Sequence, residues 1–168
     1  AVTIDDRAII STVEITAGQS VVAATIHGIS DPGCCPTLGV RQTYALEGGS
    51  PTLIHQASTA ASGAERAIYI TSPLSGSQAV PPVRIQGHMP LAPFENNLVY
   101  RVYDLSFNEL DAGPFGVTAI DMGIPAQFDN LVSSPAFLPG ATLWFELMDT
   151  SAADVTPLAI ERIKLTIQ

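Results

Sequence analysis

Lysine is almost absent from this sequence, because Lys164 is the only one and the other basic side chains are arginines. Sixteen acidic residues oppose seven basic residues and leave a formal net charge of −9. A protein with this charge repels the phosphates of nucleic acids and the headgroups of anionic lipids. The charge balance therefore argues against nucleic acid as a partner.

Long apolar runs are also absent, since no stretch approaches the ~20 apolar residues that a transmembrane helix requires. We therefore expect no membrane span. Little lysine, combined with abundant serine, threonine, glycine, alanine and proline, is typical of secreted or cell-surface proteins. The chain begins with Ala1 rather than methionine, which fits either a processed terminus or an arbitrary boundary.

Catalytic signatures are missing as well. The sequence has neither the H-E-x-x-H pattern of zinc proteases nor the G-x-S-x-G pattern of serine hydrolases. His27, His55 and His88 each lie near the end of a predicted strand, where a solvated or hydrogen-bonded histidine is the usual case. The sequence therefore predicts a non-enzymatic protein with no catalytic residue, no cofactor and no metal site.

Acidic residues gather at two predicted loops and could supply the oxygen ligands of a calcium ion. Their spacing fits no EF-hand, and acids on the loops of a sandwich are usually solvated, so calcium is not predicted. These residues are Asp104, Glu109, Asp111, Asp149 and Asp154.

The two cysteines, Cys34 and Cys35, are adjacent in a loop rich in proline and glycine. Neighbouring Cα atoms lie ~3.8 Å apart, closer than the usual ~4.4–6.8 Å of a disulfide, so a bridge would be strained. An oxidising exterior permits it. Only His27 and Asp31 are near, too few ligands for a tetrahedral metal site. We expect the cysteines to lock this loop, bridged or as two buried thiols, without redox turnover.

What the sequence does contain is a regular alternation of apolar and polar residues, which is typical of strands with one buried face. Tyr103 and Trp144 fall on the polar side of their strands, where they would cover a neighbouring module or offer a surface for stacking sugars. The apolar side is predicted to lie between two sheets and comprises Leu98, Tyr100, Val102, Leu143, Phe145, Leu147, Ile163, Leu165 and Ile167.

Seven strands are predicted after residue 65, and segment 128–133 is a candidate for another. Turn signals such as Gly113-Pro114 and Pro139-Gly140 separate them. Short strands without helical periodicity predict an all-β protein with an immunoglobulin-like Greek-key sandwich. The seven predicted strands span residues 67–71, 79–87, 97–104, 108–112, 116–122, 141–148 and 158–167.

Residues 1–58 are predicted to form a separate, small antiparallel β module, followed by a linker at 59–65 and the sandwich at 66–168. The module contains two hairpins and few aromatic residues, so it is marginal alone. We expect it to pack on the sandwich or on something outside the chain. Its predicted strands span residues 7–15, 20–27, 39–46 and 52–56.

Two resemblances follow from motifs that occur in order along the chain. The C-terminal part resembles the immunoglobulin-like domain found at the end of bacterial spore-germination and related secreted lipoproteins. The N-terminal part looks like a module of secreted bacterial lipoprotein-like proteins, and on that comparison the chain starts partway through the module. Neither resemblance implies a catalytic residue. The motifs are Ile68-Tyr69-Ile70-Thr71-Ser72-Pro73, Val80-Pro81-Pro82-Val83-Arg84-Ile85-Gln86-Gly87, Phe94-Glu95-Asn96-Asn97-Leu98 and Gly113-Pro114-Phe115 for the first, and Asp6-Arg7, Asp31-Pro32 and Cys34-Cys35-Pro36-Thr37 for the second.

Two functional hypotheses remain. In the first, the protein is an extracellular structural subunit that self-associates into a homo-oligomer or a filament by pairing of strand edges, because a sheet with few strands leaves an unpaired edge. In the second, it is an accessory module that binds a cell-wall glycan or a protein partner. The residues expected to serve assembly are Val2, Ile4, Ile9, Tyr103 and Trp144.

Overall fold

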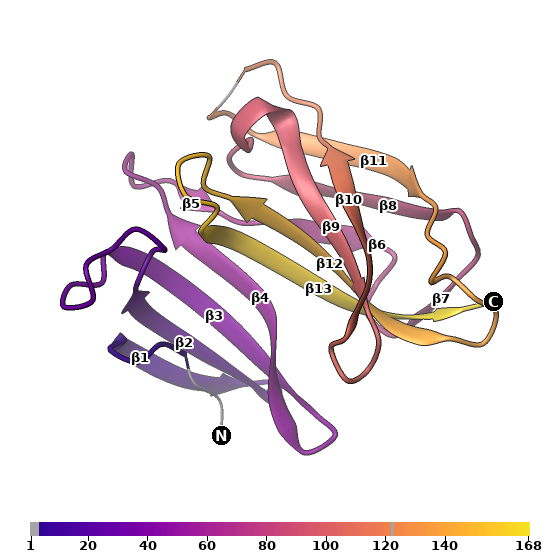
Figure 1. Cartoon of the computed structure of the whole chain (residues 1–168), viewed down its shortest axis with the longest axis horizontal. Coiled ribbons are helices and arrows are strands. Elements are labelled where there is room, and N and C mark those ends of the chain that lie inside the picture. The colour runs from indigo at the N-terminus through magenta and orange to yellow at the C-terminus, as the bar shows by residue number, and fades with distance from the viewer. Residues whose placement is uncertain (1–3, 122) are drawn as a thin grey trace.

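The structure is a computed structural model that describes residues 4–121 and 123–168 (Figure 1). Within these residues the chain forms thirteen strands and one short 3-10 turn (Phe94–Asn96), and no α-helix. The strands before residue 70 are β1 (Ile9–Thr16), β2 (Gln19–Ile26), β3 (Leu38–Glu47), β4 (Ser50–Thr59), β5 (Glu65–Arg66) and β6 (Tyr69–Ser72). The later strands are β7 (Ser77–Ala79), β8 (Val83–Met89), β9 (Asn97–Tyr103), β10 (Glu109–Gly116), β11 (Ala126–Val132), β12 (Thr142–Thr150) and β13 (Pro157–Ile167).

These strands form two sheets. The larger, ten-stranded sheet has the order β1-β2-β3-β4-β13-β12-β9-β10, with β5 paired to β4 and β7 paired to β13. The smaller sheet has the order β11-β8-β6. All named pairings are antiparallel except that between β7 and β13. The prediction of an all-β fold built from antiparallel sheets is confirmed.

The small sheet lies over the C-terminal half of the large sheet (Figure 1), and the main core is packed between them. Eight of the nine predicted core residues are buried there, and Tyr100 is partly buried against the same cluster. Phe145 is fully buried, with its ring 6.1 Å from that of Tyr100. The alternation of apolar residues therefore identified the buried face correctly.

Two predicted strand boundaries were wrong. Residues 108–112 and 116–122 were expected as separate strands, but one strand, β10, continues to Gly116. Among the residues described beyond it, up to residue 121, Thr118 alone forms a bridge, to Gln127. β10 tolerates Pro114 because it is an edge strand, where a missing N–H breaks no ladder. Segment 79–87 is divided between β7 and β8, because Pro81-Pro82 supplies no N–H donors. The candidate strand at 128–133 is present as β11.

The N-terminal strands continue the large sheet, so they do not form a separate sheet. Both predicted hairpins are present, as β1–β2 and β3–β4. β4 then pairs with β13 at Gln56 opposite Ile160 and His55 opposite Glu161. The segment expected as a linker is also structured, because β4 runs to Thr59 and a tight turn leads back to β5. The small residues Ala57 and Ser58, in β4 just before this turn, are buried.

A second, smaller core lies on the opposite face of the large sheet. It comprises Val22, Ala24, Val40 and Tyr44, with the partly buried side chain of Ile4 against it. Buried polar groups beside this core are satisfied through a chain of hydrogen bonds. The Tyr44 hydroxyl donates to the Gln42 Oε1 (2.8 Å), the Gln42 Nε2 donates to the Gln56 Oε1 (2.7 Å), and the Gln56 Nε2 donates to the Pro157 carbonyl (2.9 Å). This chain links β3, β4 and the start of β13.

Candidate functional site

The most exposed regular element among the described residues is β1, at one end of the large sheet. Its sequence IISTVEIT is rich in β-branched residues, which favour strands. The turn Ala17-Gly18 leads into β2 with φ angles of 51° and 77°, the left-handed pair that suits a two-residue hairpin loop. All eight residues of β1 are exposed, and no described strand pairs with its outer side.

A β-bulge aligns the apolar side chains of β1. The register of β1 with β2 shifts between Ile10 and Thr12, so Ser11 is the extra residue. As a result Ile10 lies opposite Ala24, Val13 opposite Val22 and Ile15 opposite Ser20. Because opposite residues share a face, these three apolar side chains form one row on the face of the smaller core. They are 53%, 61% and 80% exposed, respectively.

The other end of the large sheet is protected. Pro114 in β10 lacks an N–H, and Glu109 and Asp111 place charge along this strand. The side-chain amide of Asn130 also donates to the Gly116 carbonyl (2.6 Å). These are devices by which proteins block further pairing at a sheet edge. Of such protective features, β1 has only the bulge and the single charge of Glu14.

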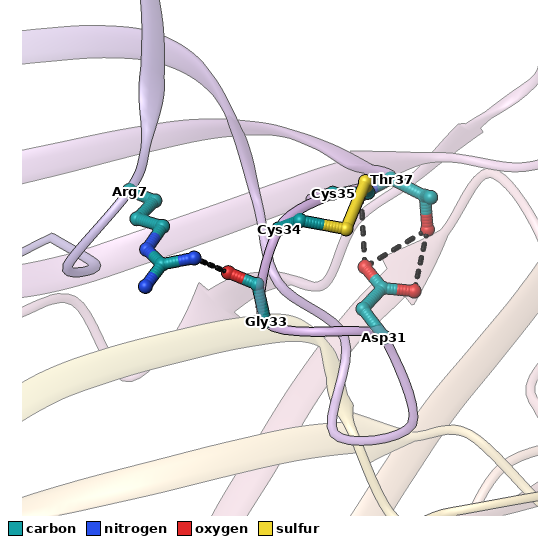
Figure 2. The surroundings of a disulfide bond; sticks show 6 residues. All are labelled: Arg7, Asp31, Gly33, Cys34, Cys35 and Thr37. Carbon is teal, nitrogen blue, oxygen red and sulfur yellow. Dashed lines mark hydrogen bonds between the residues drawn. A yellow bond between two sulfur atoms is a disulfide. The ribbon is translucent and has the colours of Figure 1, made fainter.

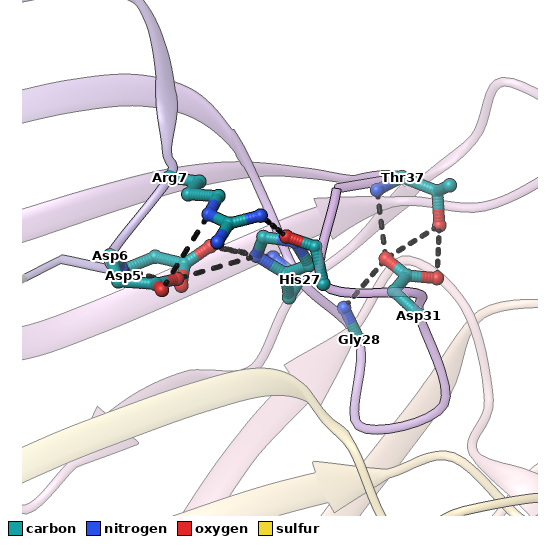
Figure 3. Close-up of polar contacts among 8 residues, drawn as sticks. Asp5, Asp6, Arg7, His27, Gly28, Asp31 and Thr37 are labelled. Atoms are coloured by element: carbon teal, nitrogen blue, oxygen red, sulfur yellow. Dashed lines mark hydrogen bonds and ion pairs between the residues drawn. The ribbon is translucent and has the colours of Figure 1, made fainter. Parts of the chain in front are cut away.

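The residues just before β1 are held by their own chain (Figure 3). The Asp5 carboxylate accepts hydrogen bonds from the backbone N–H of His27 (2.9 Å) and from its ring Nδ1 (2.7 Å). These bonds, the backbone bond first, lower the pKa of Asp5 to about 2. Arg7 donates to the carbonyl of Gly33. Ile4, expected to serve assembly, instead packs against the smaller core, and Val2 lies outside the described residues.

Asp5, Asp6 and His27 are the one group of three metal-ligating side chains that the described residues bring within reach of a single ion, with ligand atoms within 4.8 Å of one another. Sequence reasoning missed it because 22 residues separate Asp5 from His27. The His27 Nδ1 is already bonded to Asp5, and the Arg7 Nε lies 3.9 Å from the Asp6 carboxylate. A guanidinium at this position competes with a cation, so the group acts as a clamp on the start of β1.

The structure pairs Cys34 and Cys35 with each other in a disulfide, with their Cα atoms 3.8 Å apart (Figure 2). Both residues are exposed, so the alternative of two buried thiols is wrong. The loop around them is held by the Asp31 carboxylate, which accepts bonds from the N–H groups of Gly28 (2.9 Å) and Thr37 (2.8 Å) and from the Thr37 hydroxyl. The bond from Gly28 is the main cause of the lowered pKa of Asp31.

The same loop is tied to the turn between β12 and β13. The Ser30 hydroxyl donates to Asp154 (2.7 Å), and the Ile29 N–H donates to the Thr156 hydroxyl (2.7 Å). Hydrogen bonds, first that from Ser30, hold the pKa of Asp154 well below its usual range. The cysteine loop is therefore anchored on both sides, which fits a structural role.

Tyr103 and Trp144 lie in a groove of about 810 Å³ between the β3–β4 turn and the loop after β9. Trp144 is only 2% exposed, because the ring of Phe107 stacks on it at 5.7 Å and the Lys164 ammonium lies 4.8 Å from its centroid. Trp144 therefore cannot itself present an assembly surface. Arg162 lies 5.3 Å from the Phe107 centroid and bonds to the buried carboxylate of Glu146 (2.5 Å).

Phe107, the most exposed ring of this groove, was missed by sequence reasoning. It follows Asp104, whose carboxylate accepts bonds from the N–H groups of Ser106 (2.8 Å) and Asn108 (2.9 Å). This turn gives Phe107 a φ of 62° and directs its ring over Trp144. The spacing D-x-x-x-N from Asp104 to Asn108 indicates the turn, but nothing in it indicates the contact of Phe107 with Trp144.

Two of the three histidines, His55 and His88, lie on either side of Tyr69. His55 bonds to Glu161, and the ring of Tyr69 stacks between those of His55 (5.5 Å) and His88 (5.2 Å). His27 takes no part in this stack. Burial raises the pKa of Glu161, against the effect of its bond to His55. The arrangement joins β4, β13, β6 and β8 and contains no nucleophile beside a base.

The loop acids do not converge either. Glu109 bonds to Arg101 (2.9 Å) and Asp111 accepts a bond from Tyr100 (3.2 Å). Asp149 is 1% exposed, with Arg66 3.4 Å from its Oδ2. Burial raises the pKa of Asp149 to about 6, although the charge of Arg66 opposes this shift.

Comparison of the chain with models of protein families, with curated protein sequences and with solved structures gives no match. Both resemblances named above therefore remain predictions. No helix in the described part of the chain is long and apolar enough to cross a membrane.

Proposed function

We propose that this protein is a non-enzymatic structural subunit of the bacterial cell exterior that self-associates through the free edge of β1. The observation that carries the proposal is that all eight residues of β1 are exposed, including its row of Ile10, Val13 and Ile15. An open edge presents unpaired N–H and C=O groups, and a second strand that pairs with it gains main-chain hydrogen bonds. Burial of the apolar row adds affinity.

The contrast between the two ends of the large sheet supports this proposal. β10 carries Pro114, two acids and the bond from Asn130, whereas β1 has almost none of these protections. A long, apolar edge without them favours pairing with another chain. The resemblance of residues 66–168 to domains of secreted lipoproteins supports an extracellular location and an immunoglobulin-like topology as parts of the same proposal.

The filament expected from the sequence needs two different edges, one on each side of the contact. Within the large sheet the second edge would be β10, which the features above obstruct. The geometry therefore favours a paired assembly through β1, and a filament would need a further contact elsewhere.

Sedimentation velocity over a range of concentrations tests the proposal. We expect the unmodified protein to associate as concentration rises, and Val13→Asp to remain monomeric because it places a charge in the centre of the row. Leu131→Asp is the matched control, since Leu131 is equally exposed at 66% but lies on the small sheet. Association of Val13→Asp that equals that of the unmodified protein would contradict the proposal.

A second candidate function, binding of a cell-wall glycan, is favoured by the groove at Tyr103, Phe107 and Trp144. Rings and polar groups together are what sugar binding requires, and Phe107 is the exposed ring, at 37%. Binding of purified cell wall by the unmodified protein, and its loss in Phe107→Ala but not in Leu131→Asp, would support this function. If purified cell wall retained Phe107→Ala and Leu131→Asp equally, the groove would be excluded as the glycan-binding site.

A further inference from the structure

The register of β1 identifies its partner. We infer that β1 pairs with β1 of a second copy, an inference that rests on the proposed self-association. The two strands would run antiparallel and be related by a two-fold axis through Val13. The inference follows from the order of the side chains along β1 and from the position of its bulge.

The bulge makes the strand self-complementary. Ile10, Val13 and Ile15 occupy one face of β1, and Ile9, Thr12, Glu14 and Thr16 the other, because their partners on β2 alternate in that way. We place the axis at Val13 and leave Ser11 as the extra, unpaired residue in each copy. Ile10 then lies opposite Ile15 of the second copy, and the two Val13 residues lie opposite each other. Every apolar residue of the row then faces another.

The same register suits the opposite face. Glu14, the one charge in β1, lies opposite Thr12 of the second copy, and Ile9 lies opposite Thr16. An axis at Glu14 would place two carboxylates opposite each other, which is destabilising. An axis at Thr12 would put Glu14 opposite Ile9 and would leave Ile15 beyond the end of the strand. The axis at Val13 is the one of these three that uses the whole strand without a charge conflict.

The pairing also extends a core that already exists. The row of β1 lies on the same face as Val22, Ala24 and Val40 of the smaller core. Two copies joined at β1 would therefore bring their smaller cores side by side into one apolar strip across the axis. The other sheet edges fit less well, because β10 is protected as described, β11 is bridged by Thr118 at Gln127, and β6 has only four residues. A closed, two-fold pair is the expected product.

Site-specific cross-linking of the full chain tests the register. Under mild oxidation Val13→Cys should form a disulfide between two copies, because opposite Cβ atoms lie about 4.5–5.5 Å apart. Ile10→Cys and Ile15→Cys should cross-link when mixed, and much less when oxidised separately. The unmodified protein controls for exchange with Cys34 and Cys35, and peptide mapping identifies the joined segments.

The outcomes separate this inference from the proposal on which it rests. If Val13→Cys fails to cross-link and the mixture gives no product, while Val13→Asp still abolishes association, β1 binds a different edge and the two-fold register is overturned. If Val13→Asp leaves association unchanged, self-association through β1 fails as well. Cross-links at Val13 and in the mixture, together with loss of association in Val13→Asp, support both.

Discussion

The Asp5 carboxylate holds both the backbone N–H and the ring Nδ1 of His27, at 2.9 and 2.7 Å. Two residues later Arg7 bonds to Gly33, so the approach to β1 is fastened to the loop that follows β2. The strand that we propose for association is therefore positioned by contacts within its own subunit, and only its outer edge is left free.

We predict that this clamp opens in acid. Because the pKa of Asp5 is lowered from 3.8 to about 2 in the folded protein, its contribution to stability is present above about pH 4 and is lost as the pH falls through about 2. The amide resonance of His27 reports directly on the bond. It should titrate near pH 2 in the unmodified protein, and the titration should be absent in Asp5→Asn. A titration of this amide near pH 4 would disprove the lowered pKa.

The buried carboxylate of Asp149 leads to the opposite prediction. Its pKa is raised from 3.8 to about 6 in the folded protein. The contribution of this group to the free energy of unfolding is therefore fully present below about pH 4 and is lost as the pH rises through about 6. Asp149→Asn removes the charge that is 1% exposed, while Arg66 is 22% exposed and keeps partial access to water. We expect this variant to be more stable by up to ~3 kcal/mol at pH 8, at about 1.4 kcal/mol per pKa unit, and the gain to vanish at pH 4.

Urea unfolding of Asp149→Asn at both pH values measures this difference. Asp129→Asn is a suitable control, because Asp129 is exposed and its pKa is lowered by the bond from Arg84. A gain for Asp149→Asn that is equal at pH 4 and pH 8 would show that the charge of Asp149 is not its cause.

Removing the central ring of the core between the two sheets should destabilise the protein strongly. Phe145 is fully buried against Tyr100, so Phe145→Ala should lower the free energy of unfolding by about 3–5 kcal/mol. Leu131→Ala, at a site 66% exposed, should change it by less than about 0.5 kcal/mol. Denaturant unfolding of both variants measures the costs, and similar values would contradict the assigned core.

The cysteine loop predicts an intramolecular bridge. Non-reducing mass spectrometry should find a single chain that is lighter than the reduced form by the mass of two hydrogen atoms, with Cys34 and Cys35 in one linked peptide. Because Asp31 and Asp154 hold the loop independently of the bridge, the double variant Cys34→Ser and Cys35→Ser should still fold. A peptide that joins Cys34 or Cys35 to a second chain would instead assign the pair to assembly.

Local patterns predicted the parts of the fold that depend on neighbours in sequence. The strands expected at 7–15 and 20–27 predicted the first hairpin, and the alternation around Phe145 predicted the buried face. The pairing of β4 with β13 joins His55 to Glu161, 106 residues apart, and no local pattern encodes such a contact. For the same reason residues 59–65 had the composition of a linker although they turn tightly between two paired strands.

The candidate site was predicted only in outline. An unpaired edge in the N-terminal part was expected, and β1 provides it, but Ile4 was assigned to assembly although it packs inward. The bulge at Ser11 was not foreseen, because it depends on the register with β2 rather than on the sequence of β1. Trp144 was misjudged because its strand face looked polar, whereas Phe107 and Lys164 cover its ring.

Hydrogen exchange of β1 as a function of protein concentration tests the central claim most directly. The outward N–H groups of Ile9–Thr16 have no partner among the described residues of one subunit, and pairing with a second copy would protect them. We predict that their protection rises with concentration, while that of β8 in the small sheet stays constant, and that Val13→Asp removes the dependence. Exchange of β1 that is fast and independent of concentration, in a protein that sediments as a monomer throughout, would contradict the account.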